Sequence, residues 1–165
     1  MASAENLTTQ FLTFALAHDA FAVDVQIAKE IVDYAEVTQV PQTPDYLLGV
    51  INLRGAVVPV IDMRLKFGME EGATTENSCI IVMEVDVNGE IVTAGALVDS
   101  VQEVMDLSES QIEPPPKIGT RMNTDYIKGM GNMGEKFLIL LDMNKVFSIE
   151  ELELVQDLHS EEIDA

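Results

Sequence analysis

Short apolar runs of strand length dominate the hydrophobic pattern of this chain. They are rich in Val, Ile, Leu and Phe and are separated by turn residues, and few windows show the 3.6-residue period of an amphipathic helix. The runs cover residues 11–16, 20–25, 27–33, 48–53, 56–61, 78–87, 90–98, 101–105 and 137–141. Many short strands with little helix are typical of closed or sandwiched sheets, so the pattern predicts a mostly β fold.

Turn and cap residues mark the boundaries between these runs. Asn88-Gly89 predicts a type I′ hairpin, because both central residues of that turn need a positive φ. Arg54-Gly55 predicts a second hairpin. Capping residues predict a short helical turn after Asp62, another after Ser108, and a longer C-terminal helix after Ser148. The expected helices are therefore few and mostly short.

An internal repeat is the most informative feature of the pattern. Residues 45–67 align without gaps on residues 125–147, at an offset of 80. The identical pairs are Asp45/Asp125, Tyr46/Tyr126, Gly49/Gly129, Asn52/Asn132, Asp62/Asp142, Met63/Met143 and Phe67/Phe147. Such a repeat predicts two related lobes. With the polar stretch 69–77 as the boundary, we expect one lobe at 1–72, a second at 73–150, and an acidic C-terminal helix or tail at 151–165.

The charge balance excludes two classes of partner. The 165 residues include 9 Lys and Arg against 29 Asp and Glu, a net charge of −20, while 47% of residues are hydrophobic. Such a chain can build a core, but its field repels phosphate backbones and anionic lipid surfaces, so we expect no nucleic acid partner. A single cysteine, an N-terminus unlike a signal peptide and apolar runs too short to span a bilayer favour a cytoplasmic protein without membrane insertion.

No catalytic constellation emerges from the residue types. The segment Gly129 to Gly134 matches G-x-G-x-x-G, but a strand follows it where a nucleotide site needs a helix, so it is interpreted as a glycine-rich turn. The two histidines, His18 and His159, have no nucleophile nearby, and Cys79 lies in an apolar run without an adjacent cation. No Cys/His cluster has zinc spacing. We therefore expect no enzyme activity, no cofactor and no metal.

Two charged residues stand where a plain core does not require them. Arg54 occupies a predicted hairpin tip, and Glu30 interrupts the apolar run 27–33. Arg54 could simply be a solvated turn base, and Glu30 a solvent-facing strand position. The alternative is that the two residues form an ion pair.

The segment Gly49 to Gly55, followed by Val57 to Asp62 with Arg64 and Phe67, resembles the signature of the CheW family of bacterial chemotaxis coupling proteins. Supporting blocks are residues 29–31, 97–101, 112–116 and 139–142, and the resemblance covers about residues 10–150. It implies two SH3-like five-stranded β-barrels, in agreement with the repeat. It also implies a non-catalytic adaptor between the cytoplasmic tips of transmembrane chemoreceptors and the histidine kinase CheA, located at the inner face of the membrane through receptor arrays.

The resemblance also implies two contact surfaces. A receptor tip is a helical hairpin, which fits an apolar trough between the lobes with polar rims; Gly95 would allow its close approach. The expected receptor-binding residues are Glu30, Ile31, Arg54, Cys79, Gly95, Val98, Val101 and Val104. Docking onto the homologous regulatory domain of CheA is expected to use Val40, Pro44, Leu48 and Val57. The alternative function, a small-ligand-binding double barrel, would need a closed polar pocket.

Overall fold

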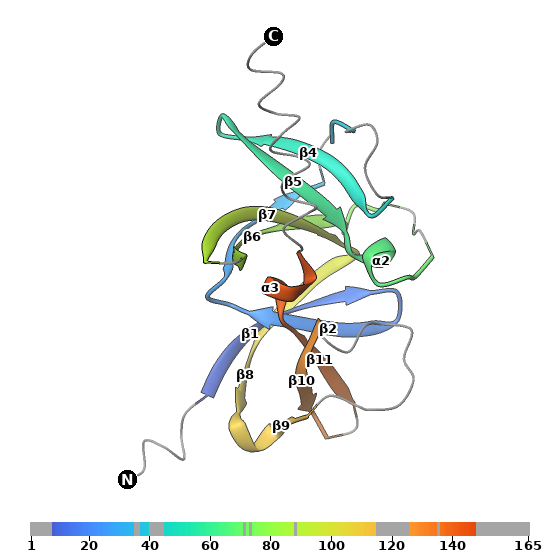
Figure 1. Ribbon diagram of the computed structural model, residues 1–165. Helices are drawn as coiled ribbons and strands as arrows, with labels where there is room; N and C mark the ends of the chain where they lie inside the picture. The colour runs from blue at the N-terminus through green and yellow to red at the C-terminus, as the bar shows by residue number, and fades with distance from the viewer. Residues whose placement is uncertain are drawn as a thin grey trace.

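Two antiparallel-rich β-sheets make up the fold (Figure 1). The computed structural model describes residues 8–34, 37–39, 45–70, 72, 74–87, 89–114, 126–134 and 136–147. The predicted C-terminal helix and the proposed tail 151–165 lie outside the described residues. Val40 and Pro44 also lie outside them.

Each described strand belongs either to a five-stranded sheet or to a six-stranded sheet. The five-stranded sheet runs, in spatial order, β3 (Ala28–Asp33), β6 (Cys79–Val87), β7 (Glu90–Val98), β5 (Ala56–Asp62) and β4 (Leu47–Leu53). The six-stranded sheet runs β8 (Ser100–Ser108), β1 (Thr8–Leu16), β2 (Asp19–Asp24), β11 (Phe137–Leu141), β10 (Ile127–Asn132) and β9 (Ile112–Glu113). The predicted mostly β fold with two related units is confirmed, and the sixth strand is the two-residue β9.

Each sheet curls until its two edges meet. In the five-stranded sheet, Thr38 lies beyond edge strand β3 and exchanges two backbone hydrogen bonds with Val50 of the opposite edge strand β4, each 2.9 Å. In the six-stranded sheet, Glu113 of β9 pairs with Met130 of β10, which is the repeat equivalent of Val50. Both sheets therefore close by the same contact, which accounts for their barrel-like curvature.

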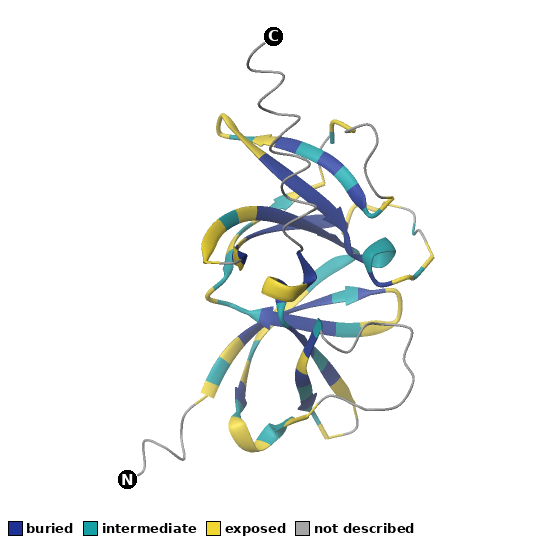
Figure 2. Ribbon diagram, in the orientation of Figure 1, coloured by how far each residue is buried: buried dark blue, intermediate teal, exposed yellow. Residues whose placement is uncertain are grey.

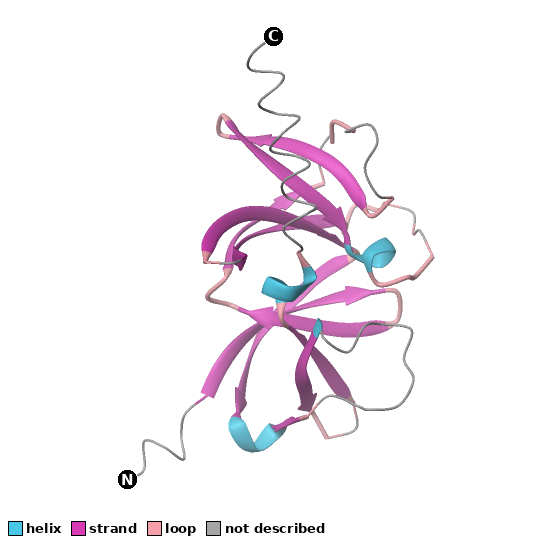
Figure 3. Cartoon of the chain, in the orientation of Figure 1, coloured by secondary structure: helices cyan, strands magenta, loops and turns pink. Residues whose placement is uncertain are grey.

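The sequence repeat corresponds to a repeat of register. The β4–β5 hairpin pairs Leu47 with Ile61 and then Gly49 with Val60, and the β10–β11 hairpin has the same slip eighty residues later. Each hairpin leads into a helical turn, α2 (Met63–Lys66) or α3 (Met143–Val146), capped by the Asp62 or Asp142 carboxylate. Figure 3 shows both turns near the junction of the sheets. A third, 3₁₀ turn, η1 (Glu109–Gln111), joins β8 to β9.

The boundary predicted between residues 72 and 73 does not separate the two sheets. Strands β1 and β2 belong to the six-stranded sheet together with β8 to β11, while the five-stranded sheet is one continuous piece from β3 to β7. The N-terminal hairpin belongs to the six-stranded sheet because β2 pairs in parallel with β11. The equivalent parallel pairing in the five-stranded sheet is that of β7 with β5. The N-terminal hairpin thus takes the place in its sheet that β6–β7 takes in the other.

The largest cluster of buried side chains, here called the shared core, is built by both sheets and both helical turns (Figure 2). A row of aromatic rings crosses it: Phe21 lies 6.0 Å from Phe14 and 5.8 Å from Phe67, and Phe67 lies 5.9 Å from Tyr126, centroid to centroid. Each sheet also encloses a smaller cluster of its own. Because strand side chains alternate, one face of each sheet contributes to the shared core and the other to its own cluster.

Glycine positions confirm two predictions about turns. Gly129 and Gly131 lie within β10 and Gly134 in the turn before β11, so the G-x-G-x-x-G segment is a hairpin and not a nucleotide loop. A hairpin between β6 and β7 is confirmed by the pairing of Val87 with Glu90 and by the positive φ of 85° at Gly89, whereas Asn88, the other residue of the predicted turn, lies outside the described residues.

Candidate functional site

The tip of the β4–β5 hairpin presents Arg54 to solvent. Leu53 pairs with Ala56 across a two-residue turn in which Arg54 has φ 50° and Gly55 has φ 88°. Two positive φ values define the type I′ family of turns. The Asn52 side chain supports the turn by accepting a 2.9 Å hydrogen bond from the Gly55 amide. This local sequence therefore places a charged side chain at a fixed point on the rim of the five-stranded unit.

Arg54 forms a two-pronged ion pair with Glu30, as the ion-pair alternative predicted. Nη1 of Arg54 donates to Oε1 of Glu30 over 3.2 Å, and Nη2 donates to Oε2. Glu30 lies on β3 and Arg54 beside β4, so the pair joins the two edges that curling brings together. The hydrogen bonds from Arg54, together with its charge, lower the pKa of Glu30, and the same contacts raise the pKa of Arg54. The Arg54 side chain is 71% exposed, so the pair leaves most of the guanidinium available to a partner.

Four of the apolar candidates differ in exposure: Ile31 and Val104 are exposed, Val101 is half-buried against the shared core, and Cys79 is buried within it. We call these four residues the edge surface. Ile31 is 47% exposed and Val104 49%. Ile31 pairs with Ile81, a neighbour of Cys79 on the same face of the sheet. The Val101 backbone lies near enough to the Cys79 thiol to lower the pKa of that thiol, so the start of β8 lies beside the five-stranded unit here.

The Cys79 thiol is suited to packing rather than to chemistry. Burial raises its pKa, and the nearby Asp33 charge adds to the effect, against the smaller opposite effect of the Val101 amide. A thiol with a raised pKa is a poor nucleophile at neutral pH. The expectation of an unreactive cysteine agrees with this environment.

Three of the expected receptor-binding residues lie inside the protein: Cys79, Val98 and Gly95. Val98 is 1% exposed and belongs to the shared core. A Cβ added to Gly95 would lie 2.8 Å from Cγ2 of Ile80 and 3.3 Å from Cγ2 of Val60, within the cluster enclosed by the five-stranded sheet. The glycine at 95 therefore serves close packing in that cluster, and not the close approach of a partner. Strand β7 is apolar on both faces, so the sequence could not show which residues face the shared core and which face the cluster enclosed by the five-stranded sheet.

The two described kinase candidates lie on opposite faces of the β4–β5 hairpin. Leu48 is half-buried and packs against the cluster enclosed by the five-stranded sheet. Val57 is 37% exposed and pairs with the exposed Asn52, whereas the next pair, Ile51 and Val58, points inward. A partner that binds the outer face of this hairpin would therefore contact the Val57 side chain more than the Leu48 side chain, which points toward the enclosed cluster.

A second two-pronged ion pair, between Arg64 and Asp99, was not predicted from the sequence. Nε of Arg64 lies 2.8 Å from Oδ1 and 3.1 Å from Oδ2 of Asp99, and Nη2 also donates to Oδ2. The Ala17 amide donates to the same carboxylate over 2.8 Å. Arg64 stood out in the sequence only as part of a motif, because a partner 35 residues away leaves no local signal.

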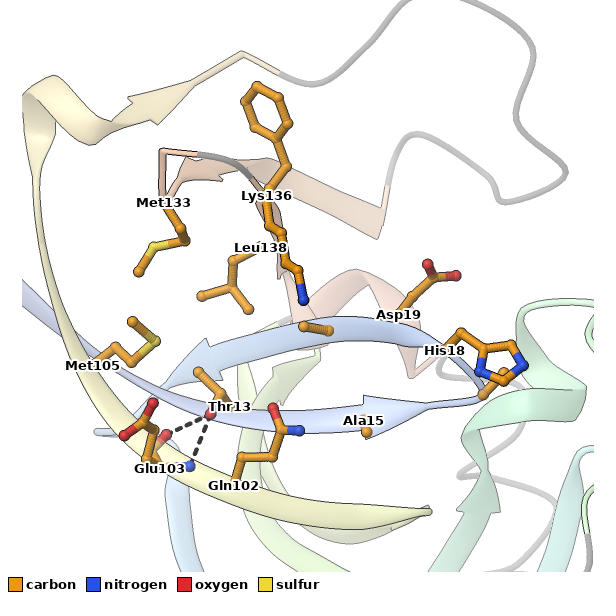
Figure 4. Close-up of a pocket in the computed structure, with 13 residues that line it drawn as sticks. Thr13, Ala15, His18, Asp19, Gln102, Glu103, Met105, Met133, Lys136 and Leu138 are labelled. Carbon is orange, nitrogen blue, oxygen red and sulfur yellow. Dashed lines mark hydrogen bonds between the residues drawn. The ribbon is translucent and has the colours of Figure 1, made fainter.

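A hollow of about 610 Å³ opens on the six-stranded unit (Figure 4). Met105, Met133 and Leu138 line one part, and Figure 4 shows the Lys136 side chain reaching into it. His18 and Lys136 are exposed, so the hollow is open to solvent. It is not the closed polar pocket that a small-ligand-binding double barrel requires, and none of the expected receptor- or kinase-binding residues lines it.

Neither metal ligation nor a membrane-spanning helix is found in the part of the chain that the structure describes. Within those residues, no three His, Cys, Asp or Glu side chains are grouped so that they could hold an ion. No helix there has the length and apolar character needed to cross a bilayer.

Known proteins resemble this chain over most of its length. The family model described as "CheW-like domain" matches residues 10–151. The chain is 39% identical over 153 residues to chemotaxis protein CheW of Klebsiella aerogenes, covering 93% of this chain and 90% of that protein. It is 30% identical over 149 residues to chemotaxis protein CheW of Treponema pallidum, covering 90% and 88%. The crystal structure of the scaffolding protein TtCheW from Thermoanaerobacter tengcongensis superposes with a TM-score of 0.78 at 32% identity, covering 88% and 91%.

Proposed function

Because this chain belongs to the CheW-like family, we propose that it is a chemotaxis scaffold that couples chemoreceptors to the histidine kinase CheA and catalyses no reaction itself. The observation that carries the proposal is the family match over residues 10–151, which includes every described strand except the first residues of β1. Relatives that match over most of their own length are named as chemotaxis or scaffolding proteins. Through its receptors, the protein would be located at the inner face of the membrane.

The receptor contact would use the edge surface together with the Glu30–Arg54 pair. A helical hairpin binds well to an apolar strip flanked by polar side chains. Ile31 and Val104 supply exposed apolar area, and Arg54 supplies a charged group held by Glu30. Val98 would support this surface from within the shared core, and Gly95, which packs in the cluster enclosed by the five-stranded sheet, would have no part in the contact.

The kinase contact would use the exposed face of the β4–β5 hairpin, with Val57 near its centre. A specific interface buries roughly 800 Å² on each partner, and a few central apolar residues supply most of its binding energy. Since this chain has a net charge of −20, fit at apolar residues would matter more than Coulomb attraction. Binding to the CheA regulatory domain should then persist at ~0.5 M salt, where the Debye length is only a few ångströms.

The test is reconstitution from purified components. Receptor cytoplasmic fragments assembled on vesicles are mixed with CheA, with and without this protein, and both co-sedimentation and CheA autophosphorylation are measured. We expect this protein to sediment with the receptors, to recruit CheA and to make its activity responsive to receptor ligand. Recruitment of CheA that does not depend on this protein would overturn the proposal.

A further inference from the structure

Asp99 stands where the chain passes from one sheet to the other. It is the single residue between β7 of the five-stranded sheet and β8 of the six-stranded sheet. Its backbone amide donates to the Ala15 carbonyl over 3.1 Å, and its carboxylate accepts from the Ala17 amide over 2.8 Å. Asp99 thus fastens the crossover to the β1–β2 turn, where Ala17 has the unusual φ of 56° for a residue with a side chain.

Arg64 completes this fastening from the five-stranded unit. Its guanidinium holds both carboxylate oxygens of Asp99, and its side chain is only 23% exposed. Gly72 packs against the guanidinium so closely that an added Cβ would lie 2.7 Å from Nε. A planar guanidinium that donates hydrogen bonds to both carboxylate oxygens, and that is itself closely packed, fixes the orientation of the Asp99 side chain. A flexible lysine would not do so.

The second repeat makes a contact between the two units from the same position. Asn144 is the repeat equivalent of Arg64, and its side-chain oxygen accepts a 2.8 Å hydrogen bond from the Asp86 amide on β6. Asn144 lies on α3, which follows the six-stranded sheet, and Asp86 belongs to the five-stranded sheet. The second residue of each helical turn therefore reaches toward the other unit. Arg64 forms an ion pair with the Asp99 side chain, whereas Asn144 accepts a single hydrogen bond from a backbone amide.

We propose that Arg64 is a positioning residue for the receptor-contact surface: through Asp99 it fixes the start of β8, which carries Val101 and Val104. This inference rests on the proposed function and adds the residue that orients its receptor site. The path is short, since Ser100 alone separates Asp99 from Val101, which pairs with Phe14 of β1 and packs against the shared core. Without the ion pair, the crossover keeps its backbone hydrogen bond but loses the contact that sets its orientation relative to α2.

Arg64→Gln tests the proposal, because it removes the charge and the two-pronged contact while keeping a long polar side chain. We expect receptor-fragment affinity to fall about tenfold, a loss of ~1.4 kcal/mol. Amide hydrogen exchange should become faster at Ala17 and Val101, and affinity for the CheA regulatory domain should stay within twofold. Arg64→Lys, which keeps the charge without the planar contact, should restore only part of the receptor affinity.

Asn144→Ala is the matched control, since it removes the contact between the units at the equivalent position without touching β8. It should leave receptor affinity within twofold even if it lowers the melting temperature. Equal losses of receptor affinity in Arg64→Gln and Asn144→Ala would indicate a general stability effect and overturn the proposal. If Arg64→Gln fails to fold, Asp99→Asn takes its place, because it keeps the shape and one acceptor oxygen.

The two proposals can fail separately. If the unmodified protein does not bind receptor fragments, the proposed function is wrong, and the exchange rates at Ala17 and Val101 still report whether Arg64 orders β8. If the unmodified protein binds and a folded Arg64→Gln binds equally well, the positioning role is wrong and the proposed function stands.

Discussion

Arg54 combines an unusual backbone conformation with a side chain that is mostly exposed. Its φ of 50° is an outlier for a residue with a side chain, and Glu30 holds its guanidinium from one side only. An exposed ion pair of this kind adds little to stability. The pair is therefore better suited to orienting Arg54 toward a partner than to holding the fold together.

Arg54→Ala should weaken receptor binding and leave the fold intact. We expect a roughly five- to tenfold loss of receptor affinity, because a charge aimed at the partner is removed. The melting temperature should change by less than about 2 °C, since alanine has the same backbone strain at this position. Lys29→Ala is the control: it removes another exposed ion pair, with Glu84, from β3, the strand that carries Glu30. A large stability loss in Arg54→Ala with receptor binding preserved would refute the orienting role.

Asp99 makes stability depend on pH in one direction. Burial alone would raise its pKa, but the hydrogen bonds from Arg64 and the Ala17 amide outweigh burial, so its pKa lies below the ordinary value. A carboxylate with a lowered pKa stabilises the fold above its unfolded-state pKa of about 3.9, and this contribution is lost as pH falls through the folded-state pKa. The Arg64–Asp99 pair should therefore contribute at neutral pH and not in strong acid.

Urea unfolding of the unmodified protein and of Asp99→Asn between pH 7 and pH 3 measures this contribution. The difference in their free energies of unfolding should be constant from pH 7 to about 5 and should shrink below about 4. The other carboxylates titrate alike in both proteins, so the difference isolates residue 99. A difference that stays the same down to pH 3 would show that the carboxylate charge is not what stabilises the crossover.

At the scale of elements, the β4–β5 hairpin has two chemically different faces. Leu48 packs inward against the cluster of the five-stranded sheet, whereas Val57 faces outward beside Asn52. Leu48→Asp should therefore lower the free energy of unfolding by about 2–4 kcal/mol, because it places a charge against an apolar cluster. Val57→Asp should leave stability nearly unchanged and weaken binding to the CheA regulatory domain at least about tenfold.

Ile91→Asp is the matched control for Val57→Asp. Ile91 is 63% exposed at the start of β7, so it receives the same chemical change on the same unit, away from the hairpin face. Titration of the CheA regulatory domain by calorimetry compares the two variants. Equal affinity in Val57→Asp and Ile91→Asp would place the kinase contact on another face of the protein.

Strand β7 has no space for a side chain at residue 95. A Cβ at residue 95 would approach Ile80 to 2.8 Å, so Gly95→Ala should destabilise the fold by about 1–3 kcal/mol through overpacking. Receptor affinity of the folded variant should remain unchanged. In the double variant with Ile80→Ala, the losses should be less than additive, because the clashing side chain has been removed. Fully additive losses in denaturant unfolding would show that the Ile80 contact is not the cause.

Local signals account for the parts of the structure that the sequence predicted well. The Asp62 cap and the Asn88-Gly89 turn each depend on neighbours within a few residues, and the repeat of residues 45–67 at 125–147 is found by aligning the sequence with itself, without knowledge of spatial contacts. The Glu30–Arg54 pair could be predicted because Glu30 interrupts an apolar run and Arg54 occupies a predicted hairpin tip. The ion-pair partner of Arg64 could not be predicted from the sequence, since it depends on which strands meet across the fold. The packing of Gly95 could not be predicted either, since β7 is apolar on both faces and the sequence does not show which cluster residue 95 faces.

At the scale of the whole molecule, the two units cannot be separated by cutting the chain once. The six-stranded sheet uses strands from both ends of the described chain, and both sheets contribute to the shared core. The aromatic row from Phe14 to Tyr126 and the Arg64–Asp99 pair connect the units further. The sequence predicted two units correctly but could not show which hairpin completes which sheet, because the clear part of the repeat stops before β6.

Thermal unfolding should therefore occur as one transition for the whole protein. Calorimetry and far-ultraviolet circular dichroism should give the same midpoint, because melting either unit exposes the shared core of the other. A fragment of residues 73–150 should show no cooperative transition, since it lacks β1 and β2 between β8 and β11. Two separate transitions in the full chain, or a folded 73–150 fragment, would contradict a shared core.

The place of the N-terminal hairpin also has a consequence for synthesis on the ribosome. Among the described strands, β1 and β2 emerge first, whereas β8 and β11, the strands on either side of them, are complete only about 84 and about 117 residues after the end of β2. At 5–20 residues per second, the hairpin waits about 4–17 s for β8 and about 6–23 s for β11. Meanwhile the five-stranded sheet, continuous from β3 to β7, can form behind it. The β1–β2 hairpin, made before the other described strands, is thus among the last to reach its native place, and during that interval its two unpaired edges are open to aggregation or to a chaperone.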